Sequence, residues 1–144
     1  MIVMQPVLSA KTAMALVRTA VDHAQRLGIS VAVAVVDGGG HLQAAWRMDG
    51  VAPAVTDFAQ DKAYTAAMLN IATAALGEQV AASPSFGHGL ASRDRLLPWG
   101  GGLPIVQDGR AIGGIGVSGA SDTDDIACAQ AALQGAGLAA GLPT

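Results

Sequence analysis

The stretch VAVAVVDGGGHLQAAWR, residues 31–47, decides how this chain folds. Its first six residues, 31–36, are all valine or alanine, which is typical of a strand covered on both faces. The DGGG segment that follows, residues 37–40, has the composition of a turn. Residues 41–47 then return as a second strand, so the stretch predicts a β-hairpin whose first strand is buried.

Helices are expected on both sides of this hairpin. Apolar residues recur at helical spacing over 9–27, with Ser9 as the N-cap and Gly28 as the stop. After the hairpin, residues 54–70 predict a second helix, and 71–81 continue as another helix after a bend. Each of these helices has an apolar side that has to be buried against a neighbouring element.

The last part of the chain predicts a long loop, a second hairpin and a final helix. Residues 82–102 contain two prolines and several glycines, and a loop of that length in a compact domain usually carries function. The Asp108-Gly109 pair is a strong hairpin signal between strands at 103–107 and 110–118. Residues 121–140 read as a helix with carboxylates in its first turn, where the helix dipole favours them.

The order helix, hairpin, helices, hairpin, helix indicates the fold class. It implies an α/β (α+β) fold with an antiparallel sheet, because parallel βαβ units would alternate single strands with helices. We expect a sheet of about five strands with helices on both faces. The length of 144 residues predicts one domain over residues 1–144.

Composition excludes several classes of protein. Hydrophobic residues make up 51% of the chain and charged residues 13%, which predicts a packed core rather than disorder. The net charge of −3, with no basic run, argues against nucleic-acid binding. Cys128 is the single cysteine, so an intrachain disulfide is excluded. We see neither a signal peptide in residues 1–10 nor an apolar stretch of ~18 residues, so a cytoplasmic protein without a membrane span is expected.

Five short motifs carry a resemblance to a known family. They are VVDGGGHL at 35–42, RMDG at 47–50, DKAYTA at 61–66, GGLP at 101–104 and IGGIGVSG at 112–119. In this order they resemble the GlcG/HbpS-like haem-binding family. That family also supplies the C-terminal domain of PduO-type corrinoid adenosyltransferases, and residues 84–104 are most similar to that branch.

The resemblance implies a profilin-like fold of α-β-α layers, assembly into a homo-oligomer, and haem or another tetrapyrrole as ligand. Our first hypothesis is therefore a binding protein that holds haem, or a related planar anionic ligand, in a cleft between helix and sheet. A second hypothesis is an enzyme, an isomerase, tautomerase or hydrolase, acting on a small carboxylated metabolite. A third is an accessory subunit with no ligand of its own.

Lys62 is the residue on which these hypotheses depend most. It falls inside the apolar stripe of the helix at 54–70, where a lysine has to be paired, to snorkel or to line a cavity. The ammonium could receive a haem propionate or an acidic substrate, or act as a base or nucleophile with a lowered pKa. It could equally form a structural ion pair with Asp37 or Asp49.

The three histidines are His23, His41 and His88, and neutral imidazole is the usual axial ligand of haem iron. His23 and His41 are candidates for binding the cofactor, one at the edge of a helix stripe and the other just beyond the glycine turn. His88, in the long loop, joins Lys62 and Asp49 as a candidate for proton transfer in the enzyme hypothesis. Each histidine could instead be an ordinary surface residue. Their spacing matches no zinc signature, so no structural metal is expected.

Glycine-rich turns could bring backbone N–H groups against a ligand. Gly101, Gly102 and Gly119 are the candidates, and tight turn geometry is the alternative explanation for them. Residues 114–119 form a literal GxGxxG, the fingerprint of dinucleotide-binding folds. We reject that interpretation because only residues 120–144 follow, too few for a helix and the next parallel strand.

Overall fold

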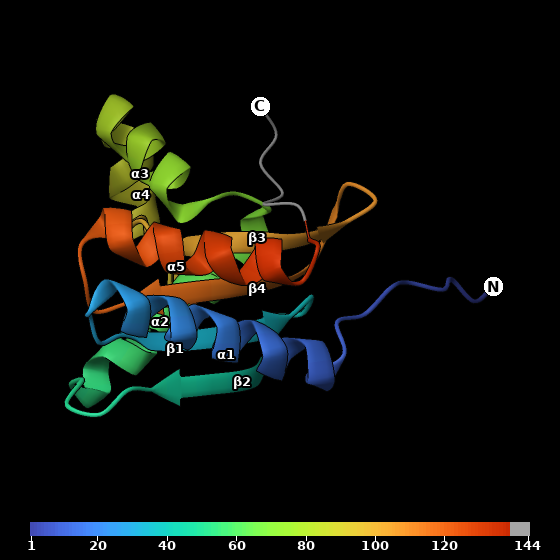
Figure 1. Cartoon of the computed structure of the whole chain (residues 1–144). Coiled ribbons are helices and arrows are strands. Elements are labelled where there is room, and N and C mark those ends of the chain that lie inside the picture. The colour runs from blue at the N-terminus through green and yellow to red at the C-terminus, as the bar shows by residue number, and fades with distance from the viewer. Residues whose placement is uncertain (139–144) are drawn as a thin grey trace.

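The computed structural model describes residues 1–138 and has an α+β architecture with one antiparallel sheet (Figure 1). The sheet has four strands in this range, where about five were expected, and five helices surround it. In chain order the elements are α1 (Ala10–Leu27), β1 (Ala32–Asp37), β2 (Leu42–Arg47), α2 (Pro53–Leu69), α3 (Thr73–Ala82), α4 (Pro84–Ala91), β3 (Gly102–Gln107), β4 (Arg110–Ser118) and α5 (Asp122–Gly135).

The sheet is built from the two hairpins that the sequence predicts. The strand order is β2-β1-β4-β3, so each hairpin contributes one inner and one outer strand. The inner strands β1 and β4 pair antiparallel, with Val33 opposite Val117 and Val35 opposite Ile115. These four side chains are all fully buried, which agrees with the continuous apolar run that predicts a strand covered on both faces.

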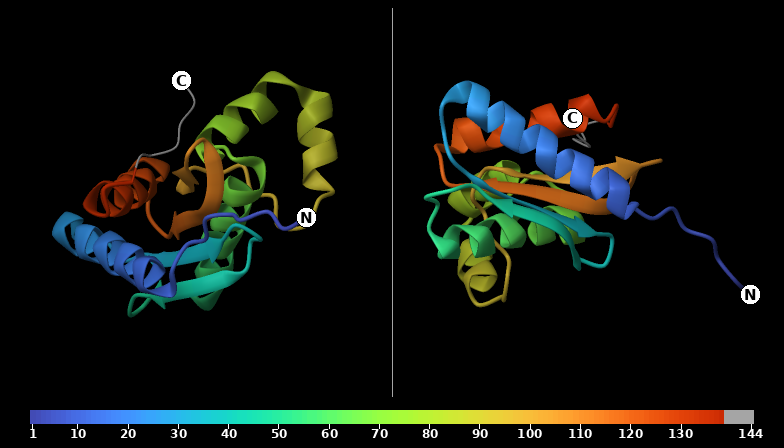
Figure 2. Two further views of the ribbon diagram at one scale, coloured as in Figure 1. Left: turned by 90° about the vertical axis from the view of Figure 1, so that its right-hand side faces the viewer. Right: turned by 60° about the horizontal axis from the view of Figure 1, so that its bottom comes forward.

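Helices cover both faces of the sheet, as expected (Figure 2). Helices α1 and α5 pack side by side on one face, and α2 lies along the other. The main core is between α1, α5 and the sheet. The pair α3 and α4 extends past the β3 edge as a separate arm. No helix within residues 1–138 is long and apolar enough to cross a membrane.

Helix α2 sits unusually close to the sheet because β4 presents glycines to it. A Cβ at Gly116 would collide with the carbonyl oxygen of Ala59 and lie 2.7 Å from the amide nitrogen of Ala63. At Gly114 a Cβ would collide with the carbonyl oxygen of Ala63. The bare backbone of β4 therefore forms the surface on which α2 rests. This contact fixes the depth at which Lys62, which lies between Ala59 and Ala63 on α2, enters the fold.

The ends of the first and last helices follow from their capping residues. The Ser9 hydroxyl accepts a hydrogen bond from the Thr12 amide, and Gly28 adopts φ 71°, so both predicted caps of α1 are confirmed. Helix α5 ends at Gly135, earlier than the predicted residue 140, because Gly137 adopts φ 68° and the Leu138 amide donates back to the Leu133 carbonyl oxygen at 2.9 Å. The last two residues of that prediction, 139–140, lie outside the described residues.

The region expected as one long loop, residues 82–102, contains helix α4. Ser83 caps it by accepting a hydrogen bond from the Phe86 amide at 3.4 Å, and Pro84 occupies its first turn. Serine followed by proline is a helix-start signal, which the glycines further along obscured. The correction matters because α4 places side chains that a flexible loop would leave free.

Candidate functional site

Lys62 lies on the buried side of α2, with 2% of its surface exposed. Its ammonium Nζ donates to the carbonyl oxygen of Val117 at 2.9 Å and to Asp125 Oδ2 at 3.3 Å. The core-side position was predicted, but the acid that pairs with it is Asp125, and neither Asp37 nor Asp49. The ammonium is therefore occupied by the protein's own oxygen atoms.

Asp125 completes this buried pair from α5. It is 2% exposed, and its second oxygen, Oδ1, accepts a hydrogen bond from the Ala120 amide at 3.0 Å. Burial lowers the pKa of Lys62 and raises the pKa of Asp125, while their mutual attraction opposes both shifts. The pair joins α2 to the start of α5 at the end of β4.

Two of the predicted glycines pack around the same pair. A Cβ at Gly101 would lie 3.1 Å from Lys62 Nζ, and one at Gly102 would lie 2.6 Å from the Lys62 carbonyl oxygen. The Gly102 amide donates to the Thr73 hydroxyl at 2.8 Å. The structure thus brings Lys62, Gly101 and Gly102 together, but the space beside them is filled by Thr73 and Asp125. The surroundings of Gly101 and Gly102 agree with the alternative explanation, in which these glycines serve a tight turn and do not contact a ligand.

The remaining non-histidine candidates lie elsewhere. Gly119, at φ 123°, is exposed at the end of β4, next to Ala120, whose amide already bonds to Asp125. Asp49 is exposed in the turn after β2, and its carboxylate makes no hydrogen bond within residues 1–138.

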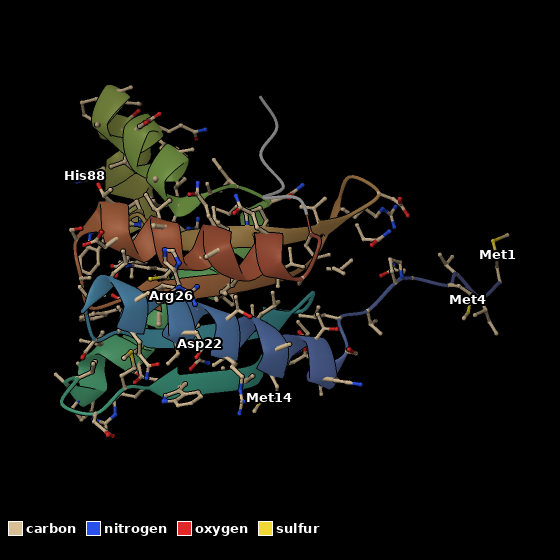
Figure 3. The ribbon with its side chains drawn as sticks, in the orientation of Figure 1. Met1, Met4, Met14, Asp22, Arg26 and His88 are labelled. Carbon is tan, nitrogen blue, oxygen red and sulfur yellow. The ribbon has the colours of Figure 1, made fainter. Side chains whose placement is uncertain are left out.

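The three histidines do not converge. His23 is half-buried on α1, whereas the side chain of His41 is 82% exposed, with Nδ1 3.3 Å from Asp37 Oδ1. His88 is exposed on α4, far from the labelled α1 residues Asp22 and Arg26 (Figure 3). Across residues 1–138, no three histidine, cysteine, aspartate or glutamate side chains gather into a metal-binding group.

A large apolar cavity lies between α3, in a region expected to be helical, and α4, in the region expected to be loop. Its volume is about 630 Å³. One charged side chain lines it, that of Arg93, which follows the end of α4. Its walls are Leu69, Ile71, Leu76, Gln79, Ser85, Phe86, Gly89, Leu90, Arg93 and Leu96. Sequence reasoning missed this cavity and Arg93, because the Ser83-Pro84 helix start was the only local signal for it.

His88 borders this cavity without lining it. Pro84, Ser85, His88, Gly89 and Ser92 form a shallow hollow on an adjoining side of α4. Ser85 and Gly89 belong to both the hollow and the cavity, so the two surfaces meet along α4. Of the three histidines, His88 is therefore the one whose position in the sequence is closest to residues that line the cavity.

The segment after α4 is fastened to the outer side of α2. The Arg95 guanidinium stacks 3.9 Å above the Tyr64 ring and lies 3.3 Å from the Asp61 carboxylate. The Trp99 and Phe58 rings meet edge-to-face at 5.5 Å. These contacts fix the chain that leaves α4, and so they hold the wall of the cavity at Leu96.

Comparison with known families matches residues 8–134 to the family described as "Haem degrading protein HbpS-like". Among curated proteins, the chain is 38% identical over 112 residues to Protein GlcG of Escherichia coli K12, covering 78% of this chain and 81% of that protein. It is 36% identical over 120 residues to the corrinoid adenosyltransferase PduO of Salmonella typhimurium, covering 82% of this chain. The match spans only 35% of that PduO's length.

Solved structures give the same picture of the fold. The crystal structure of HbpS matches with a TM-score of 0.85 and 33% identity, covering 92% of both chains. A crystal structure of a PduOC–haem complex matches with a TM-score of 0.85 and 32% identity, covering 94% of this chain and 99% of that one. The similarity therefore extends over nearly the whole described fold.

Proposed function

Because this chain belongs to the HbpS-like family, we propose that it binds haem or a related tetrapyrrole in the cavity between α3 and α4. The observation that carries the proposal is an apolar cavity of about 630 Å³ with a single guanidinium among its lining side chains. Haem has the matching chemistry, since it combines a broad apolar ring with two propionates. The PduOC–haem complex, at 32% identity, supports the choice of ligand.

The residues that line the α3–α4 cavity fit both the apolar ring of haem and its two propionates. Leu76 and Leu90 form buried walls, and Phe86 offers a half-exposed aromatic side chain for contact with a flat macrocycle. Arg93 would receive a propionate, because a guanidinium binds a carboxylate through two parallel hydrogen bonds. In this proposal Arg93 takes the anion-binding role that the sequence suggested for Lys62.

The iron ligand is a separate part of the proposal. No histidine lines the cavity, so the fit of its walls is to the macrocycle rather than to the iron. We propose His88 as the first candidate for axial ligand because its hollow shares Ser85 and Gly89 with the cavity. His23 and His41 stay as alternatives. When bound, haem would supply redox and oxygen chemistry that no side chain of the chain provides.

Titration of the purified protein with haemin tests the proposal. We expect a saturable Soret shift, and Arg93→Gln should weaken haemin binding about tenfold or more, by the loss of a charge-assisted bond. Phe86→Ala should weaken it severalfold. Trp46→Ala is the matched control, because Trp46 is also a partly exposed aromatic side chain, at 42%, and it lies on β2, outside the cavity.

The outcomes separate the parts of the proposal. If the Soret shift is lost in only one of His88→Ala, His23→Ala and His41→Ala, that histidine is the axial ligand. Absence of any saturable shift would overturn haem binding as a whole. If Arg93→Gln and Phe86→Ala bind haemin as tightly as the wild type does, the haem site is not in the α3–α4 cavity.

The enzyme hypothesis gains no support from the geometry. It requires Lys62, Asp49 and His88 around one substrate. Lys62 is buried in an ion pair, Asp49 is in an exposed turn, and His88 is on the outer surface of α4. We therefore propose no acid–base reaction at these residues.

We also propose that the chain self-associates through its N-terminal segment, residues 1–7. Met1, Ile2, Val3, Met4 and Val7 are each at least 71% exposed, and the segment projects from the body of the molecule (Figure 3). Contiguous exposed apolar side chains are typical of subunit interfaces. Light scattering should show an oligomer that Ile2→Asp with Met4→Asp weakens. A monomeric wild type would contradict this proposal.

A further inference from the structure

A second cavity, of about 370 Å³, lies beside the DGGG turn that opens the first hairpin. Three distant parts of the chain form it: the segment before α1, the first hairpin from the end of β1 to the start of β2, and β4. Its lining includes Leu8, Asp37, Gly39, His41, Gln43 and Ile112. This cavity shares no lining residue with the α3–α4 cavity, although it includes His41, which the haem proposal keeps as an alternative axial ligand.

Asp37 offers one carboxylate oxygen to this cavity. Its Oδ1 accepts hydrogen bonds from the amides of Gly39 and His41, both at 2.9 Å, and lies 3.3 Å from His41 Nδ1. Its Oδ2 accepts none from residues 1–138. Burial raises the pKa of Asp37, but the hydrogen bonds from His41 and Gly39 outweigh it and hold the pKa below the usual range. The group is therefore an anion at neutral pH.

Gln43 supplies a second unused acceptor. Its amide nitrogen Nε2 donates to the Leu8 carbonyl oxygen at 3.1 Å, and its oxygen Oε1 is buried without any donor in the described part of the chain. The reverse orientation of the amide would set Oε1 against the Leu8 carbonyl, two acceptors facing each other. Buried acceptors in proteins nearly always have a donor, so a missing donor points to a molecule that the chain does not itself supply.

The remaining walls define what that molecule can be. No lysine or arginine lines the cavity, and Leu8 and Ile112 provide aliphatic surface. His41 also lines the cavity, but its Nδ1 lies 3.3 Å from Asp37 Oδ1, so the Asp37 carboxylate already competes for it. The Asp37 carboxylate and the unbonded Gln43 oxygen both repel an anion. A volume of about 370 Å³ corresponds to roughly a dozen water molecules at ~30 Å³ each, so a small molecule fits and a tetrapyrrole does not.

We propose that this cavity binds a small molecule with a primary ammonium group, whose N–H donors reach Asp37 Oδ2 and Gln43 Oε1 and whose carbon chain packs on Leu8 and Ile112. An ammonium has three donors, which suits two separate acceptors and a third bond to solvent. The site shares no lining residue with the α3–α4 cavity, so failure of haem to bind in the α3–α4 cavity would leave the amine proposal unaffected.

NMR titration of the full chain, with 15N-labelled protein and n-propylammonium as probe, tests the inference. We expect saturable shifts of the Gly38, Gly39, Ala111 and Ile112 amides. Propionate and n-propanol are the matched anionic and neutral probes. Propionate should produce no such shifts, and the alcohol should bind at least tenfold more weakly than the amine.

Asp37→Asn is the decisive variant, because asparagine keeps an oxygen acceptor for the turn while removing the charge. It should weaken amine binding at least tenfold without changing the fold, as checked by circular dichroism. Asp22→Asn, on the exposed side of α1, is the charge-matched control and should bind the amine as the wild type does.

Three results would overturn the inference. One is binding of propionate as tight as that of the amine, and another is unchanged amine binding in Asp37→Asn. The third is a long-lived water at the Gln43 side chain with no amine-induced shifts, which would assign the cavity to solvent.

Discussion

The ammonium of Lys62 lies 3.3 Å from the carboxylate of Asp125, and only 2% of each side chain is exposed. This pair joins two helices on opposite faces of the sheet, at the end of the strand between them. A buried ion pair adds little net stability, because removing both charges from water opposes their attraction. Removing only one partner lowers the stability much more than removing both, because it leaves an unpaired charge in the core.

That asymmetry gives a first prediction. Lys62→Met should lower the free energy of unfolding by about 3–5 kcal/mol, because Asp125 is then buried without its cation. The double variant Lys62→Met with Asp125→Asn should recover most of this loss, since asparagine can still accept from the Ala120 amide. Urea denaturation measures both values. Equal stability of the single and double variants would show that the loss comes from packing rather than charge.

The sequence alone could not identify the acid that pairs with Lys62. Helical periodicity alone puts Lys62 on the core side of α2, because the side on which a helical residue falls can be read from the apolar residues within four positions of it. Asp125 lies 63 positions further along, in a first turn whose three carboxylates all look like dipole-favoured surface groups. Which of the three turns inward depends on how α5 packs across the sheet, and no local pattern records that.

The same distinction between local and distant information explains the rest of the fold. Both hairpins and the caps of α1 were predicted correctly because turn residues and capping residues act over a few positions. The α3–α4 cavity was missed for the opposite reason. Its walls come from residues between Leu69 and Leu96 that meet only because α4 folds back along α3.

A second prediction concerns the close contact between α2 and β4. Gly116→Ala should lower the free energy of unfolding by roughly 1–3 kcal/mol or more, since a methyl group would collide with the backbone of Ala59 and overpack the interface. Gly89→Ala is the control, because nothing lies within 4 Å of a Cβ there. It should be neutral or stabilise α4 by up to about 1 kcal/mol. A thermal shift comparison that ranks the two variants the other way would contradict the packing.

The single thiol gives a third prediction. Cys128 is buried in α5, and burial followed by the nearby Asp125 carboxylate raises the pKa of its thiol to about 11. At pH 8 about one thiol in a thousand would be ionised, and the thiolate is the reactive form. Labelling by a disulfide reagent should therefore be slow in native protein and fast in urea. Rapid labelling under native conditions would mean that α5 opens locally.

The last prediction is the acid sensitivity of the first hairpin, through Asp37. Its pKa is lower in the folded chain than the ordinary value of 3.8, because the amides of His41 and Gly39 stabilise its charged form more than burial disfavours it. The unfolded chain then binds the proton more readily. The stabilising contribution is present above 3.8 and is lost as the pH falls through the lower, folded pKa.

Asp37→Asn removes this titration while keeping an acceptor for the turn. The variant should be less stable than the wild type at neutral pH, and the difference should shrink as the pH falls below 3.8. Urea denaturation at a series of pH values, with Asp22→Asn as the exposed control, measures the difference directly. A gap between wild type and Asp37→Asn that stays constant through the acid range would show that the carboxylate is not held in its charged form by the turn. In that case the anion proposed to face the second cavity would lose its basis as well.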